Sequence, residues 1–84
     1  MSRKLLKTTT KMNRDDASQK LHNLADKLAE GELNLKSGND SITLNPADQV
    51  EFELDVEEEE DGDISIEIEV EWPKNPESRE VKIN

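Results

Sequence analysis

The chain contains no cysteine, which excludes disulfide bonds, a thiol nucleophile and any metal site built on thiolates. It also lacks an apolar run near the ~20 residues that a membrane-spanning helix needs. The basic start, MSRKLLKTTTK, has no apolar stretch of the ~7 or more residues found in a secretory signal peptide. The sequence therefore predicts a cytoplasmic protein that does not insert into a membrane.

Apolar residues and positive charges are also scarce. Hydrophobic residues make up 31% of the 84 residues, charged residues make up 38%, and the net charge is −10. Nucleic acid phosphates and anionic membrane surfaces repel such a chain, so we expect neither as a direct partner. A chain of this length forms one domain at most, and it buries only about 60% of its unfolded surface, so the core is thin.

What the chain does have is strict alternation, most clearly in DISIEIEVEW, residues 63–72. One side of this segment carries the apolar residues Ile64, Ile66, Ile68, Val70 and Trp72. The composition alone is typical of disorder, but a period of two residues predicts a folded strand with one buried face. The opposite face is acidic, which raises the question of what offsets its charge.

The first third of the chain predicts a strand followed by a helix. Residues 4–12 alternate, with Leu6, Thr8, Thr10 and Met12 on one face, which is typical of a strand. Residues 13–31 then show helical spacing in an apolar stripe formed by Ala17, Leu21, Leu24 and Leu28. Asn13 is the expected N-cap and Gly31 the expected C-cap.

The rest of the chain predicts two hairpins. A two-residue loop at Gly38-Asn39 places Leu35 opposite Ile42 and Leu33 opposite Leu44. A three-residue loop at residues 60–62, with Gly62 in a left-handed conformation, gives the second hairpin a consistent apolar face. That register pairs Val56 with Ile66, Leu54 with Ile68, Phe52 with Val70, and Val50 with Trp72.

Together these segments predict an α+β domain over residues 4–73, with the order β-α-β-β-β-β. A single helix is expected to pack its stripe on one face of an antiparallel sheet of about five strands. Residues 74–84 are expected to form a polar C-terminal tail, or one short edge strand through Val81 and Ile83.

The same register predicts a carboxylate-rich face on the second hairpin. It sets Glu51 opposite Glu71, Glu53 opposite Glu69, and Asp55 opposite Glu67. Like charges directly opposite each other destabilise a sheet. Three explanations are open: Lys7 and Lys11 on a neighbouring first strand, screening by salt, or a basic partner.

A helix followed by acidic alternating strands that end in EIEVEW resembles the amphi-Trp domain family, small domains named for an amphipathic stretch ending in tryptophan. The resemblance covers residues 5–73 and is most specific from Ile64 to Trp72. It implies no activity, because the family has none established. The family is frequent in halophilic archaea, which fits the salt explanation, although eight lysines against three arginines depart from a strongly halophilic pattern.

Other candidate motifs have simpler explanations. EEEEDGD, residues 57–63, has the acidic spacing of a calcium loop, but the twelfth position is Ile68 instead of glutamate, so we interpret it as an acidic turn. His22 has no evident catalytic partner and is expected to be solvated. Trp72 is a core residue or, less favoured, a partner anchor. The sequence predicts no catalytic residue, cofactor or metal site.

The predicted function is non-enzymatic: an acidic protein-interaction domain that meets a lysine- and arginine-rich surface. The partner-binding residues would be Glu51, Glu53, Asp55, Glu67, Glu69 and Glu71. One alternative is a nucleic-acid mimic whose carboxylates occupy a DNA- or RNA-binding protein. Another is a structural homodimer formed through an open sheet edge.

Overall fold

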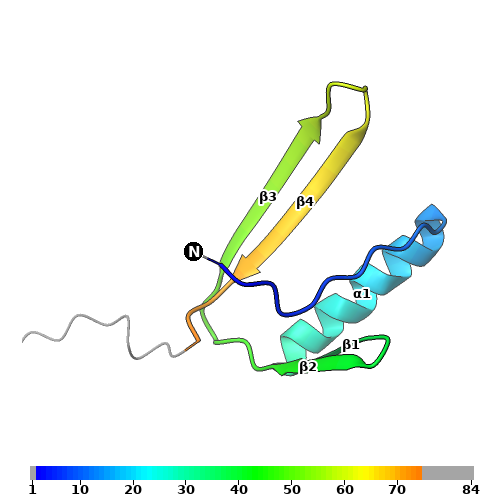
Figure 1. The fold of residues 1–84 in the computed structure, drawn as a ribbon. Helices are drawn as coiled ribbons and strands as arrows, with labels where there is room; N and C mark the ends of the chain where they lie inside the picture. The colour runs from blue at the N-terminus through cyan, green and yellow to red at the C-terminus, as the bar shows by residue number, and fades with distance from the viewer. Residues whose placement is uncertain (1, 75–84) are drawn as a thin grey trace, which may run out of the picture. The chain divides into compact units, whose positions relative to one another are not determined.

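The computed structural model describes residues 2–74 (Figure 1). They form one helix and four strands in the order α1 (Arg14–Glu30), β1 (Leu33–Ser37), β2 (Asp40–Leu44), β3 (Glu51–Glu58) and β4 (Ile64–Glu71). The predicted α+β class is confirmed. The chain divides into two compact units, Met1–Pro46 and Ala47–Asn84, which we name the N-terminal unit and the C-terminal unit.

Helix α1 begins and ends where the sequence predicts. The Asn13 side chain accepts a hydrogen bond of 2.7 Å from the backbone N–H of Asp16, which satisfies one of the free donors at the helix start. Asp15 and Asp16 lie in the first turn, at the positive end of the helix dipole. Gly31 has a φ of 87°, and its N–H bonds to the carbonyls of Leu28 and Lys27. Both predicted caps are therefore confirmed.

Strands β1 and β2 form the predicted short hairpin of the N-terminal unit. Their register pairs Leu33 with Leu44 and Leu35 with Ile42, around the loop Gly38-Asn39. Leu33 is 5% exposed, and among residues 2–74 no other hydrophobic residue is buried. Leu35, Ile42 and Leu44 are half-buried. The apolar side of this hairpin forms the centre of the small core of the N-terminal unit.

Strands β3 and β4 form the predicted long hairpin of the C-terminal unit. Val56 pairs with Ile66, Leu54 with Ile68, and Phe52 with Val70. The ladder ends at Glu51 and Glu71, so Val50 and Trp72 lie one step beyond it. In the turn, the Glu59 N–H donates to Asp63 O (2.7 Å) and the Gly62 N–H to Glu59 O (2.9 Å). Gly62 has a φ of 94°, the left-handed conformation that the three-residue loop requires.

The prediction of a single sheet of about five strands is wrong. The described residues contain two separate two-stranded sheets, β1-β2 and β3-β4. Residues 4–12 do not form the predicted first strand. Alternation makes a strand only where a neighbouring strand completes the ladder and packs beside its side chains. The explanation that places Lys7 and Lys11 on a first strand beside the glutamates therefore lacks the strand it depends on.

The apolar stripe of α1 has less cover than predicted. The helix contacts β1, yet none of its residues is buried. Leu21 is 53% exposed and Leu24 is 42% exposed. A short two-stranded sheet is too small to cover a helix of 17 residues. Such a helix is about 25 Å long and about 10 Å wide, whereas strands of five residues are about 17 Å long and two of them lie only about 5 Å apart.

Two further predictions concern the extent of the fold. The possible edge strand through Val81 and Ile83 lies outside the described residues. The single domain over residues 4–73 stays a prediction. Within residues 2–74, no helix has the length and apolar character that crossing a bilayer would require.

Candidate functional site

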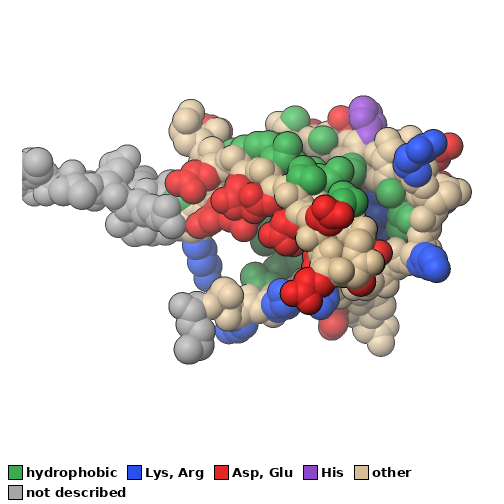
Figure 2. Space-filling model, turned by 90° about the horizontal axis from the view of Figure 1, so that it is seen from above, with side chains coloured by type: hydrophobic (Ala, Val, Ile, Leu, Met, Phe, Trp, Pro, Cys, Tyr) green, Lys and Arg blue, Asp and Glu red, His purple; other side chains and the backbone are tan. Residues whose placement is uncertain are grey.

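The six predicted partner-binding carboxylates lie together on one face of the β3-β4 hairpin. The ladder pairs Glu51 with Glu71, Glu53 with Glu69, and Asp55 with Glu67, as the sequence predicts. All six residues are exposed. Because side chains alternate along a strand, the six carboxylates share one side and the apolar residues share the other. Figure 2 shows acidic and hydrophobic side chains gathered in separate bands.

We call these six carboxylates the acidic face. No cation of the hairpin itself offsets their charge. Residues 47–73 contain no lysine and no arginine. The pKa of Glu69 is raised above its ordinary value, first because its side chain hydrogen-bonds with Glu71 and then because of repulsion from Glu53 and Glu71. A proton is therefore held more tightly at Glu69 than at an isolated glutamate, which is the expected result of crowding like charges.

The acidic face is slightly hollowed. Glu53, Asp55, Glu67 and Glu69 line a shallow depression of about 350 Å³ together with Ile68. Ionised carboxylates only accept hydrogen bonds, so they suit lysine ammonium and arginine guanidinium groups. Among residues 2–74, no group of three or more histidine, aspartate or glutamate side chains is arranged to hold a metal ion.

The acidic tip of the hairpin is ordered by its own residues. The backbone N–H of Asp63 donates a 2.9 Å hydrogen bond to Asp61 Oδ1, which closes the turn locally. This geometry supports an acidic turn at residues 59–63, whereas Glu57 and Glu58 of the predicted segment belong to β3. It also gives Asp61 a structural role, since its carboxylate fixes the backbone just after Gly62.

His22 and Trp72 are the two remaining side chains that the sequence offered as candidates. The Nε2 atom of His22 is 3.7 Å from an Asp26 carboxylate oxygen, and its side chain is 70% exposed, in agreement with a solvated helix position. Trp72 follows β4 directly and is half-buried. Half-burial suits both a structural role for Trp72 and a role as a partner anchor, so both interpretations stay open.

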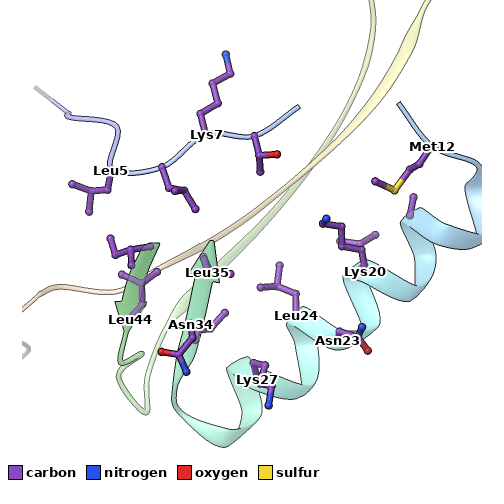
Figure 3. Close-up of a pocket in the computed structure, with 16 residues that line it drawn as sticks. Leu5, Lys7, Met12, Lys20, Asn23, Leu24, Lys27, Asn34, Leu35 and Leu44 are labelled. Atoms are coloured by element: carbon purple, nitrogen blue, oxygen red, sulfur yellow. The ribbon is translucent and has the colours of Figure 1, made fainter. Parts of the chain in front are cut away.

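An apolar groove in the N-terminal unit was not predicted from the sequence. It has a volume of about 800 Å³ and lies between the N-terminal segment, α1 and the β1-β2 hairpin. Figure 3 shows Leu5 and Leu24 pointing into this space from opposite sides, with Leu44 below Leu5. The sequence predicts a wide sheet that covers the apolar stripe of α1, and the groove exists because that sheet does not form.

The charged residues that line the groove are all basic. Lys7, Lys20 and Lys27 line it, and no aspartate or glutamate of residues 2–74 does. Asn34 also lines it, and its Oδ1 accepts a 2.6 Å hydrogen bond from the Thr43 hydroxyl, which ties the two strands together at this point. The sequence signal that could have indicated a basic, apolar surface here is the net charge of each half of the chain, taken separately.

Comparisons with known proteins agree with the resemblance seen in the sequence. The model of the family described as the Amphi-Trp domain matches residues 1–84. No curated protein and no solved structure matches the chain. Since the family model spans every residue, the chain belongs to the Amphi-Trp domain family.

Proposed function

We propose that the chain is a non-enzymatic protein-interaction domain of the cytoplasm that uses the acidic face to bind a lysine- and arginine-rich protein surface. One observation carries this proposal. The β3-β4 register places three carboxylate pairs directly opposite each other, in a segment without a single basic residue. Such an arrangement costs stability in the free chain, and a basic partner is the ligand that would relieve the repulsion.

The exposure of the acidic face indicates how it would act. Its carboxylates are solvated, so pairing them with a partner's cations requires little loss of water compared with a buried site. Exposed charges of this kind mainly speed association, fix the register of the complex and exclude acidic competitors. The field reaches over about one Debye length, ~8 Å at physiological ionic strength. Binding is therefore expected to weaken as salt rises.

The proposal is tested by capture of proteins from a native lysate, followed by elution with a salt gradient. Three forms are compared: the parent, Glu53→Gln/Glu69→Gln on the acidic face, and Glu59→Gln/Glu60→Gln at the hairpin tip. Both variants remove two charges, so the tip variant is a matched control for net charge. We expect the face variant to lose basic proteins that the parent and the control retain. Equal capture by all three forms would contradict the proposal.

A nucleic-acid competitor distinguishes the alternative of mimicry. Duplex DNA added to the captured complexes should leave a plain protein-docking partner bound. Release of the partner by DNA, at unchanged ionic strength, would show that the acidic face occupies a nucleic-acid site. Circular dichroism of each form is measured first, because a variant that is unfolded cannot report on the face.

A further inference from the structure

The outer edge of β4 is open within the described residues. β4 pairs with β3 on one side, and no strand of residues 2–74 pairs with it on the other side. This edge runs over eight residues, Ile64–Glu71, and contains neither proline nor lysine, the residues that most often block the edge of a sheet. An unblocked edge offers its backbone hydrogen-bonding groups to a further strand.

The backbone groups at this edge belong to the apolar residues of β4. The Glu59 N–H donates to Asp63 O, so these two residues form a hydrogen-bonded pair at the tip of the hairpin. Hydrogen-bonded and non-hydrogen-bonded pairs alternate along an antiparallel ladder. Counted along the register from the tip, all three pairs of the acidic face are hydrogen-bonded pairs. The residues between them therefore direct their N–H and C=O groups outward, and on β4 these are Ile64, Ile66, Ile68 and Val70.

The two sides of the edge call for different side chains on an added strand. Successive side chains of a strand point to opposite faces. On one face the added side chains would lie beside Glu67, Glu69 and Glu71, and on the other beside Ile66 and Ile68, which are 68% and 49% exposed. Opposite-charge pairs and apolar pairs across strands both stabilise a sheet. The complementary strand therefore alternates basic and apolar residues.

An antiparallel strand would approach the glutamates closely. Because Glu67, Glu69 and Glu71 direct their backbone groups towards β3, they would form the non-hydrogen-bonded pairs with a strand on the outer edge. Facing side chains come closest in such pairs, with Cβ atoms about 4.5–5.5 Å apart. Lysine or arginine at the facing positions would therefore reach the carboxylates directly.

Two features favour the β4 edge over the outer edge of β3. The outward-directed residues of β4 are all β-branched aliphatics, which suit a strand interior, whereas those of β3 include Glu58, which lies on the apolar side. The acidic face is also most crowded on β4, since the pKa of Glu69 is raised first by its hydrogen bond with Glu71 of the same strand. Cations entering at the β4 edge would meet these two carboxylates.

The glutamates also select among occupants of the edge. The β4 edge of a second copy would set glutamates beside glutamates, which destabilises a sheet and acts against self-pairing. Within the chain, residues 4–12 alternate with Lys7 and Lys11 on one face, but Leu5, Leu6 and Lys7 line the groove of the N-terminal unit. Charge complementarity therefore points to a basic segment of another protein.

We propose that the outer edge of β4 binds an extended partner segment in which lysine or arginine alternates with apolar residues, added antiparallel as a third strand. This inference rests on the proposed function and gives the form of the basic partner. In such strand addition the backbone hydrogen bonds supply affinity and the alternate side chains supply specificity. A third strand also adds to the stability of a hairpin that is marginal by itself.

The first test uses two synthetic peptides of equal composition and charge, labelled for fluorescence anisotropy. One alternates, Lys-Val-Lys-Val-Lys-Val-Lys, and the other is blocked, Lys-Lys-Lys-Lys-Val-Val-Val. Only the alternating peptide can place all its cations on the acidic side of an added strand. We expect it to bind the full chain several-fold more tightly than the blocked peptide. Equal affinities would overturn strand addition.

Backbone methylation of the alternating peptide tests the edge hydrogen bonds themselves. In the proposed pairing the valines face Ile66 and Ile68 and donate their N–H groups to β4, whereas the lysine N–H groups point away. N-methylation of two valines should weaken binding several-fold, and N-methylation of two lysines is the matched control that should change it little. Equal weakening by the two patterns would overturn the proposal.

Proline variants of the protein test which edge is used. Ile68 and Leu54 form one ladder pair, and both direct their N–H groups outward, where proline is compatible with the β3-β4 ladder. Ile68→Pro should lose several-fold in affinity for the alternating peptide, whereas Leu54→Pro should keep it. The opposite result, or equal loss in both, would contradict the assignment to β4. Circular dichroism is measured first, and the methylated peptides test the parent chain if a proline variant is unfolded.

The proposed function and this inference fail separately. If Glu53→Gln/Glu69→Gln weakens both peptides equally while the parent does not distinguish them, the acidic face binds cations and strand addition is wrong. If the double variant binds both peptides as the parent does, the acidic face is not the binding surface and the proposed function is wrong.

Discussion

The two units of this chain use the same kind of hairpin with different results. In the N-terminal unit, β1-β2 lies against α1 and buries Leu33 to 5% exposure. In the C-terminal unit, β3-β4 is longer and has a more regular apolar pattern, yet Phe52 and Ile66 are 66% and 68% exposed. Alternation therefore decides which side chains share a face, but a second layer decides whether that face becomes a core.

The units also differ in how their charge is arranged. In the N-terminal unit the lysines are interspersed with acidic residues, and Lys27 forms a 3.7 Å ion pair with Glu30 on α1. In the hairpin of the C-terminal unit, carboxylates face carboxylates and residues 47–73 offer no cation. The first unit therefore has cations among its acidic residues and pairs some of them locally, whereas the acidic face of the second has no cation within residues 47–73 to offset it.

The largest expected effect is at the buried leucine of the N-terminal unit. Leu33→Ala should lower the free energy of unfolding by about 2–5 kcal/mol, because it removes the buried side chain and leaves a cavity. Urea unfolding followed by circular dichroism measures it. Leu54→Ala on the 55% exposed position of the other hairpin is the comparison, and dilute samples should show a smaller loss. Equal losses for the two variants in dilute solution would remove the contrast between the units.

The helix cap gives the next largest effect. Asn13→Ala should cost about 1 kcal/mol, because the Asp16 N–H loses its side-chain acceptor. Asn23 is a matched control in the same helix, where it accepts only a side-chain hydrogen bond from Gln19. Asn23→Ala should be nearly neutral or slightly stabilising, since alanine is the better helix former. If thermal melts of the two variants coincide, the cap does not contribute to the stability of this unit.

Salt should stabilise the C-terminal unit more than the N-terminal one. Screening weakens the repulsion across the three carboxylate pairs, so the melting temperature should rise in both sodium and potassium chloride. The rise should be smaller in Glu53→Gln/Glu69→Gln, which lacks one opposed pair. A flat response of the parent would indicate that the carboxylates are already offset.

The smallest effect is the pH dependence at Glu69. Its pKa in the folded chain is raised by the Glu71 hydrogen bond and by Glu53, so the folded state binds a proton more readily than the unfolded state. The destabilisation by this group is complete above the raised pKa. It disappears as pH falls through that value towards the ordinary glutamate pKa of about 4.3.

Glu69→Gln provides the test of that sign. The variant should be more stable than the parent at neutral pH, and the gap should close under mild acid, where the parent's Glu69 is protonated. Paired thermal melts along a pH series measure the gap. A gap that widens on acidification would contradict the assigned shift.

Local features of the fold could be predicted because their causes are local. Asn13 caps the start of the helix and Gly31 caps its end, each through hydrogen bonds to residues no more than four positions away. Gly62 and the three-residue loop set the register of β3-β4, and Gly38-Asn39 sets that of β1-β2. The acidic face follows directly from that register, so the alternation and the turn residues together were enough to identify all six of its carboxylates.

The joining of segments into sheets could not be predicted in the same way. Residues 4–12 have strand-like alternation, but a ladder needs a partner whose identity is not encoded in that segment. The groove between Leu5, Leu24 and Leu44 follows from the absence of that wider sheet. The sequence pattern therefore identifies faces reliably and leaves open which face covers which.

The central claim, that the acidic face is a binding surface for basic partners, is tested most directly by titration with oligolysine in low and high salt. Calorimetry would compare the parent with Glu53→Gln/Glu69→Gln and with the charge-matched Glu59→Gln/Glu60→Gln. We expect the face variant to bind several-fold more weakly than the tip variant in low salt, and all three to bind weakly in high salt. Equal affinities for the two variants would show that oligolysine responds only to net charge, and that the acidic face is an ordinary solvated surface.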